Sequence, residues 1–196
     1  FQKPAREDYN AIVKGFLPAN AQLLTPQYPV RSSEIQHVDD EGDSNRKLIA
    51  SYKVNDEIKT IILKKQNEKW LKAAEASNPG YDTINYRDVA NITGEGRKQL
   101  LLGLTSKGKV PTLYVYSLEN NGINKLFTQN YHRFEVLRSQ GQWREAPGKA
   151  QLAIWNKKDA GIYGIDILQW NGTQLVPSEN TAPYYLKMQS RITPEG

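Results

Sequence analysis

Cysteine is absent from the 196 residues, which excludes thiol nucleophiles, disulfides and thiolate metal ligands within this sequence. Histidine occurs only at His37 and His132, so few side chains titrate near neutral pH. No apolar run approaches the roughly 18 residues that a membrane-spanning helix needs. Because Cys is absent and His is scarce, we predict that the protein is not an enzyme, although catalysis by Asp, Glu, Ser or Tyr stays open.

Neither sign of charge predominates strongly, because the sequence has 26 Lys and Arg residues and 21 Asp and Glu residues, for a net charge of +5. The basic residues are spread along the chain and interleaved with acids, whereas a nucleic-acid interface gathers them on one face. We expect no nucleic-acid partner. A positive surface could still favour an anionic cell envelope or membrane.

The sequence contains a repeat with an offset of 52 residues. Segment 39–49 (DDEGDSNRKLI) aligns with segment 91–101 (NITGEGRKQLL), and the same offset leads to Gln151 and the apolar run QLAIW. A fixed period of this kind marks repeat architectures. The chain therefore holds three copies of one unit.

Each copy has a Gly-bearing or polar loop, a short apolar strand, a turn, a second strand and a hairpin turn into a third strand. The hairpin turns are predicted at Asn67-Glu68, Asn121-Gly122 and Asn171-Gly172. These signals predict an all-β fold of three antiparallel meanders, at about 34–80, 86–135 and 143–180. Such units stack as propeller blades do, and three of them do not close a ring.

The two ends of the chain differ from the repeats. Residues 1–33 carry Pro4, Pro18, Pro26 and Pro29 with few periodic apolar positions, which predicts a flexible arm over 1–20. The repeated domain follows over 21–196, with a first short strand near 21–24. Pro183 suits a first helical turn and Pro194 a helix end, so we predict a C-terminal helix over about 183–193.

The loop of the first copy is a candidate calcium site. Asp39, Glu41 and Asp43 alternate around Gly42, and calcium binds six to eight oxygens that converge on such a loop. The ninth position, which should close the cage with an acid, is Lys47. The alternative is a turn whose carboxylates cap backbone N–H groups and face water.

The other two loops depart further from a calcium site. The second copy offers oxygens with a single negative charge, at Asn91, Thr93, Glu95 and Gln99. The third copy has Trp143, Glu145, Pro147 and Gln151, which cannot form a cage. We expect no cofactor, with calcium in the first loop as the open exception.

These loops resemble degenerate D-x-D-G-D-G loops of integrin-type propeller repeats, the FG-GAP or VCBS class. The resemblance covers roughly residues 34–180 and implies blade-like sheets, an extracellular setting, and adhesion or ligand binding. The Pro-rich start at Phe1 is also similar to mature surface lipoproteins of Gram-positive bacteria. That similarity implies cell-surface anchoring, with a membrane tether through a lipidated Cys preceding Phe1.

Aromatic residues on predicted strands are further candidates for binding. Tyr114, Tyr116, Trp155 and Trp170 either pack against cross-strand neighbours or form a platform for glycan or peptide recognition. His37 and His132 are interpreted as strand or strand-edge positions.

The sequence as a whole favours a non-enzymatic extracellular or surface-anchored binding protein, monomeric, with an unknown protein or glycan ligand. Two alternatives stay open at this point. One is an enzyme that uses the carboxylates of the 39–43 loop, and the other is a structural spacer or inhibitory module.

Overall fold

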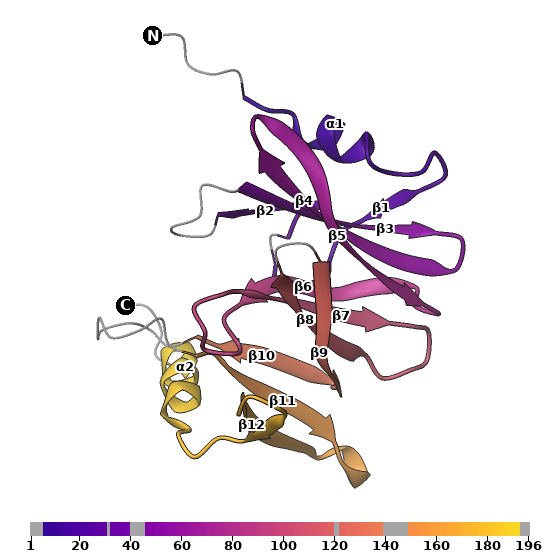
Figure 1. Cartoon of the computed structure of the whole chain (residues 1–196). Helices are drawn as coiled ribbons and strands as arrows, with labels where there is room; N and C mark the ends of the chain where they lie inside the picture. Colours follow the sequence, from indigo (N-terminus) through magenta and orange to yellow (C-terminus); the bar gives the residue numbers. More distant parts are fainter. Residues whose placement is uncertain (1–5, 31, 40–45, 120–121, 139–148, 193–196) are drawn as a thin grey trace. The chain divides into compact units, whose positions relative to one another are not determined.

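The computed structural model describes residues 6–30, 32–39, 46–119, 122–138 and 149–192. In these ranges the chain forms three antiparallel sheets, joined in chain order, with a short helix near each end (Figure 1). The strands are β1 (Gln22–Leu24), β2 (Ile35–Asp39), β3 (Arg46–Val54), β4 (Glu57–Gln66), β5 (Lys69–Pro79), β6 (Thr83–Ala90), β7 (Gln99–Thr105), β8 (Thr112–Glu119), β9 (Gly122–Asn130), β10 (Arg133–Leu137), β11 (Gln151–Lys157), β12 (Tyr163–Trp170) and β13 (Leu175–Pro177). The helices are α1 (Tyr9–Lys14), the 3-10 turn η1 (Asp159–Gly161) and α2 (Ala182–Ile192).

The predicted repeat is confirmed by the order of the strands. The second strand of each unit begins at Arg46, Gln99 and Gln151, and each sheet continues strand by strand as a meander. Within the described residues none of the three sheets closes on itself. The all-β prediction of three meander units and a C-terminal helix is therefore correct.

One predicted boundary is wrong. The sequence interpretation assigned residues up to 135 to the second unit and began the third at 143. The structure places β10 in the third sheet, because Arg133 pairs with Trp155 and Leu137 with Gln151. The third unit thus begins at 133, since sheet membership is decided by the pairing partner.

Two of the predicted hairpin turns lie within the described residues. Asn67 and Glu68 join β4 to β5 with φ of 50° and 62°, so both adopt the left-handed conformation of a type I′ turn. Asn171 Oδ1 accepts from the backbone N–H groups of Thr173 and Gln174 at 2.9 Å in the turn between β12 and β13. The turn predicted at Asn121 involves a residue outside the described ranges.

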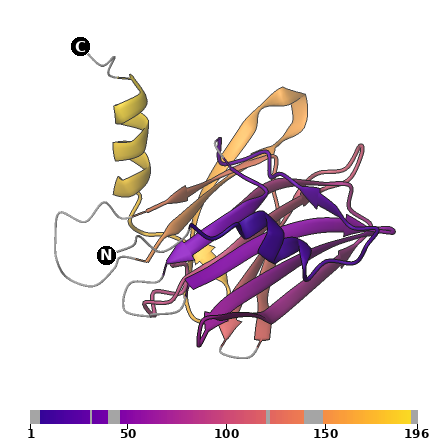
Figure 2. The same cartoon turned by 90° about the horizontal axis from the view of Figure 1, so that it is seen from above.

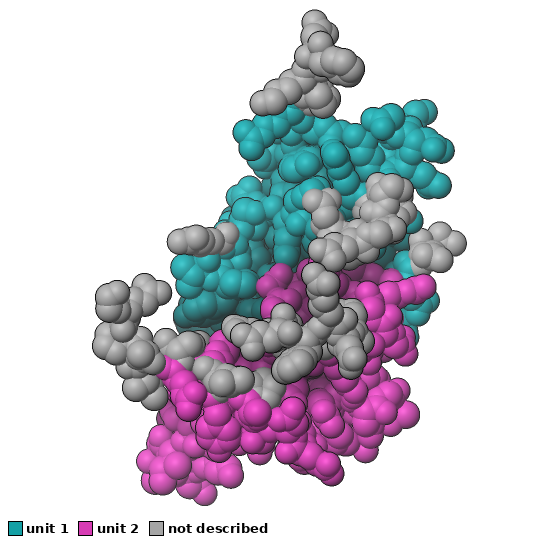
Figure 3. Space-filling view, turned by 90° about the vertical axis from the view of Figure 1, so that its left-hand side faces the viewer, with its two compact units in different colours: residues 1–87, 104–108, 119–124 teal, residues 88–103, 109–118, 125–196 magenta. Residues whose placement is uncertain are grey.

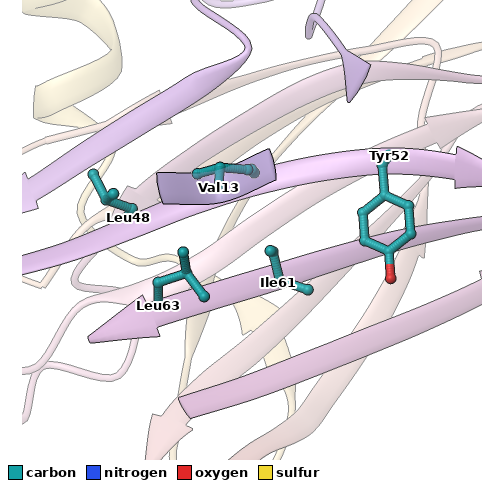
Figure 4. Packing of buried hydrophobic residues seen from close by; sticks show 6 residues of the cluster. Val13, Leu48, Tyr52, Ile61 and Leu63 are labelled. Atoms are coloured by element: carbon teal, nitrogen blue, oxygen red, sulfur yellow. The ribbon is translucent and has the colours of Figure 1, made fainter. Parts of the chain in front are cut away.

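One face of the first sheet is covered by α1 (Figure 2). Val13 of this helix is fully buried against a cluster from β3 and β4 (Figure 4), whose other members are Leu48, Ala50, Tyr52, Ile61 and Leu63. The prediction of a flexible arm over 1–20 is thus wrong for α1. Tyr9, Ile12, Val13 and Phe16 have helical spacing and pack on this cluster, and their burial holds the segment in place.

The start of α1 is held by charge as well as by packing. Asp8 is its N-cap and accepts from the backbone N–H of Ala11 at 3.3 Å. Glu7 accepts from the Lys65 ammonium at 2.7 Å and from the Trp70 indole at 3.3 Å. The hydrogen bond from Lys65 lowers the pKa of Glu7.

The chain divides into two compact units, drawn in different colours in Figure 3. Unit 1 holds the first sheet and α1, with residues up to 87, 104–108 and 119–124. Unit 2 holds the third sheet and α2, with residues 88–103, 109–118 and 125 onward. In the described ranges no helix is long and apolar enough to cross a membrane.

Candidate binding face on the third sheet

The calcium loop predicted in the first copy lies largely outside the described residues. Asp39 ends β2, where its backbone is in register with Arg46, while Glu41 and Asp43 fall in the range that is not described. Among the residues that are described, no group of three or more His, Asp or Glu side chains could hold a metal ion. The first-copy site therefore stays a prediction.

The second-copy loop is organised by the side-chain amide of Gln99, which is 3% exposed. Its Oε1 accepts from the backbone N–H of Ile92 at 2.6 Å and of Thr93 at 3.1 Å. Its Nε2 donates to Thr93 Oγ1 and to the carbonyl of Arg97, both at 3.1 Å. The amide therefore joins the two ends of the loop.

This geometry favours a turn over a calcium cage in the second copy. The hydroxyl of Thr93 and the amide oxygen of Gln99, two expected ligands, are both engaged in hydrogen bonds within the loop. Asn91 Oδ1, a third, accepts from the N–H of Gly94 at 2.9 Å. Because the amide satisfies buried donors of the loop, its shape needs no ion.

The corresponding residue of the third copy, Gln151, holds the segment that precedes α2. Its Nε2 donates to Ser178 Oγ at 2.6 Å and to the carbonyl of Asn180 at 2.8 Å. Asn180 Oδ1 in turn accepts from the N–H of Ala182, the first residue of α2. Gln151 thus fixes where the C-terminal helix starts beside the third sheet.

The third sheet has one face that is only partly covered, which we call the open face. Register places one row across it, with Arg133 opposite Trp155 and Trp155 opposite Ile165. Alternation along the strands places these residues on it, from the β11–β12 turn inward: Lys157, Tyr163, Arg133, Trp155, Ile165, Glu135, Ala153, Ile167, Leu137, Gln151, Gln169 and Val176. Ala153, Leu137 and Gln151 are buried, so the face is open only toward the β11–β12 turn.

The open face exposes large apolar side chains near the β11–β12 turn. Tyr163 is 53% exposed and Ile165 is 42% exposed, and Ile162 in the adjoining turn is 66% exposed. Trp155 is half-buried between them and β10. Exposed apolar residues that gather in one place, unlike scattered ones, mark interaction surfaces.

Charged groups of the open face are arranged around Glu135. Its carboxylate pairs with Arg133 Nη2 at 2.7 Å and with Lys187 Nζ of α2 at 3.2 Å. The Arg133 guanidinium also lies over the Trp155 ring, 5.2 Å from its centroid. The Glu135 carboxylate is therefore neutralised by two cations, Arg133 and Lys187, and the open face carries an excess of positive charge.

Helix α2 covers the part of this face nearest β10. Tyr184 lies 6.1 Å from the Trp155 ring, and Lys187 donates to the carbonyl of Val136 at 3.3 Å. Tyr185, next along the helix, is 61% exposed and 5.5 Å from Tyr184. Aromatic and arginine side chains are enriched in protein interfaces, so Trp155, Tyr184, Tyr185 and Arg133 give this face the composition of a recognition surface.

The equivalent face of the first sheet is buried. Aligning Lys47 with Gln151 places Ser51 at the position of Trp155, and Thr60 opposite Ser51 at that of Ile165. Ser51 and Thr60 are both 0% exposed and bond to each other at 2.8 Å. Arg87 of β6 covers them, with Nη1 donating to Ser51 Oγ at 3.1 Å.

The other aromatic candidates are packing residues. Tyr116 and Trp170 are each 7% exposed, and Trp170 stacks on Phe127 with ring centroids 5.4 Å apart. Tyr114 is half-buried beside Tyr116 at 6.2 Å. Of the four aromatic residues considered from the sequence, Trp155 alone lies on the open face.

The two histidines have local structural roles. His37 lies in β2 as predicted, with its ring stacked on Tyr9 at 5.4 Å. His132 lies in the bend before β10, where its Nδ1 accepts from the N–H of Lys157 at 3.0 Å. His132 was predicted on a strand, and this position is a correction.

Sequence reasoning missed Arg133, Tyr163, Ile165 and the helix residue Tyr184 as parts of a surface. The available signal was the alternation of Tyr163, Ile165 and Ile167 along one strand, which predicts a shared face. Alternation does not tell whether another layer covers that face.

No protein-family model matches the chain, and no curated protein matches it.

Proposed function

We propose that this protein is a non-enzymatic, extracellular or surface-anchored binding protein, built from degenerate integrin-type repeats, whose ligand contacts the open face. The observation that carries the proposal is the contrast between equivalent faces. Ser51 and Thr60 are buried beneath Arg87, whereas Tyr163 and Ile165 are 53% and 42% exposed. Burial of these side chains by a partner would be favourable.

The residue types on this face support binding more than catalysis. Glu135 is engaged by Arg133 and Lys187, and His132 Nδ1 accepts a backbone hydrogen bond. Neither group is presented as a general base beside a nucleophile. A partly buried Trp, exposed Tyr and outward cations instead match the centre and rim of a binding site.

Binding to intact Gram-positive cells tests this proposal with the fluorescently labelled protein. We expect saturable binding, weakened at least about tenfold by the double substitution Tyr163→Ser with Ile165→Ser, because hot-spot side chains carry most interface energy. Leu71→Ser is the matched control, since Leu71 is 49% exposed on β5 of the first sheet.

Two results would overturn the proposal. One is binding that is absent or does not respond to the double substitution while both variants melt like the parent. The other is a reproducible hydrolase or transferase activity that one Asp or Glu substitution abolishes.

A further inference from the structure

The β11–β12 hairpin concentrates exposed apolar side chains beyond the rest of its sheet. β10 pairs with β11 only from Trp155 back to Gln151, and β13 pairs with β12 only from Leu168 to Trp170. Two further residue pairs, Asn156 with Gly164 and Lys157 with Tyr163, extend past both neighbours. The hairpin, orange in Figure 2, therefore presents its turn on a two-stranded extension.

The backbone fixes how the turn presents its residues. The Lys158 N–H donates to the carbonyl of Ile162 at 2.6 Å, which closes the turn. Ala160 and Gly161 adopt left-handed φ of 63° and 79° within it. Ile162 follows directly and is 66% exposed, with Tyr163 beside it.

Cations lie on both sides of the hairpin that carries these apolar side chains. Lys157 is opposite Tyr163 in register and Arg133 lies over Trp155, whereas the Lys158 side chain lies over Gly164, on the opposite side of the hairpin. The acids nearby are Asp159 in the turn, Glu135, which Arg133 and Lys187 engage, and Asp166, which alternates to the other side of β12. Positive charge therefore predominates on the side that carries Tyr163.

We propose that this hairpin docks on an anionic phospholipid surface, with Ile162 and Tyr163 entering the headgroup region. The inference rests on the proposed function and names its ligand. Tyr and Trp favour the membrane interface, Lys and Arg stems reach phosphates while covering apolar surface, and anionic lipids attract clustered cations. A projecting hairpin with exposed aliphatic tips and flanking lysines combines these features.

Flotation of the full chain with phospholipid vesicles tests the inference. We expect binding to vesicles of equal parts phosphatidylglycerol and phosphatidylcholine, and at least about tenfold weaker binding to phosphatidylcholine alone. Raising the salt concentration should weaken the anionic-vesicle binding, because exposed charges are screened. Ile162→Ser with Tyr163→Ser, and separately Lys157→Gln with Lys158→Gln, should each weaken it about tenfold.

The β7–β8 connection supplies matched controls. It carries exposed Lys107 and Lys109, and Val110 is 44% exposed. Val110→Ser, and separately Lys107→Gln with Lys109→Gln, should leave vesicle binding unchanged within about twofold, because these residues lie outside the β11–β12 hairpin. Melting temperatures confirm that every variant is folded.

Each other outcome overturns the inference in a distinct way. Absent vesicle binding, with cell binding that still requires Tyr163 and Ile165, rejects the lipid but leaves the proposed function standing. Loss of both rejects both. Equal binding to the two vesicle types rejects the role of the lysines. A dimer in lipid-free sedimentation that the Ile162 and Tyr163 substitutions dissolve assigns the surface to a second copy of the chain.

Discussion

Equivalent faces of the first and third sheets have opposite surroundings. In the first sheet, Ser51 and Thr60 form a buried pair that Arg87 covers. In the third, the corresponding positions hold Trp155 and Ile165, and Ile165 is 42% exposed. The comparison teaches that the same strand register serves packing in one repeat and presents side chains to solvent in another.

The largest expected difference in stability is between removing the arginine of the buried face and removing the arginine of the open face. Arg87 donates to Ser51 Oγ and to the carbonyls of Ser33 and Glu34 at 3.0 to 3.1 Å, and is 2% exposed. Arg87→Ala should lower the free energy of unfolding by about 4 kcal/mol, because it leaves buried acceptors without a donor. Arg133→Ala, on the open face, should cost less than about 1 kcal/mol. Urea unfolding followed by Trp fluorescence measures both, and similar losses would remove the contrast.

A second prediction distinguishes a loop held by the hydrogen bonds of a side-chain amide from a loop held by a bound ion. Gln99→Ala should lower the free energy of unfolding by about 2 to 3 kcal/mol, since the loop loses the hydrogen bonds of a buried amide to Ile92, Thr93 and Arg97. Gln174→Ala, in an exposed turn, should change it by less than about 0.5 kcal/mol. Calcium should not restore the melting temperature of Gln99→Ala, and restoration would show that the second loop holds an ion.

The helices α1 and α2, each packed on the sheet of its own unit, should also differ. Val13 is fully buried under α1, so Val13→Ala should lower the free energy of unfolding by about 2 kcal/mol through lost burial and a cavity. Tyr185 of α2 is 61% exposed, and Tyr185→Ser should cost less than about 0.5 kcal/mol. Thermal unfolding of both variants provides the comparison, which equal losses would contradict.

The smallest effect concerns pH and the anchor of α1. Glu7 has a pKa lowered chiefly by the hydrogen bond from Lys65, so its contribution to stability is present above its usual value of 4.5. That contribution is lost as pH falls through the lower pKa of the folded state. Glu7→Gln should therefore flatten the fall in melting temperature below about pH 4.5. Glu179→Gln, an exposed control in the other unit, should retain the slope of the parent.

The repeat and its strands were readable from the sequence because turn residues and apolar runs recur at one spacing. Asn67-Glu68 and the runs that begin at Gln99 and Gln151 locate strands by local chemistry. The assignment of β10 was not readable in this way. Arg133–Leu137 has strand composition, but its sheet depends on pairing with β11, across a long intervening segment.

The candidate face was only partly readable. Trp155 stood out as an aromatic residue on a strand, while Tyr163 and Ile165 have the alternation of ordinary packing residues. Their exposure depends on whether another layer follows, which local pattern does not encode. The helix at Tyr9–Lys14 was missed because nearby prolines outweighed the helical spacing of Ile12, Val13 and Phe16.

The contrast between equivalent faces can be measured directly because the chain has no native cysteine. Single substitutions Thr60→Cys and Ile165→Cys place one thiol at corresponding positions of the first and third sheets. Reaction with a thiol reagent under native conditions should be at least about 100-fold faster at position 165, since position 60 reacts only through opening of the structure. Equal rates in two folded variants would contradict the account.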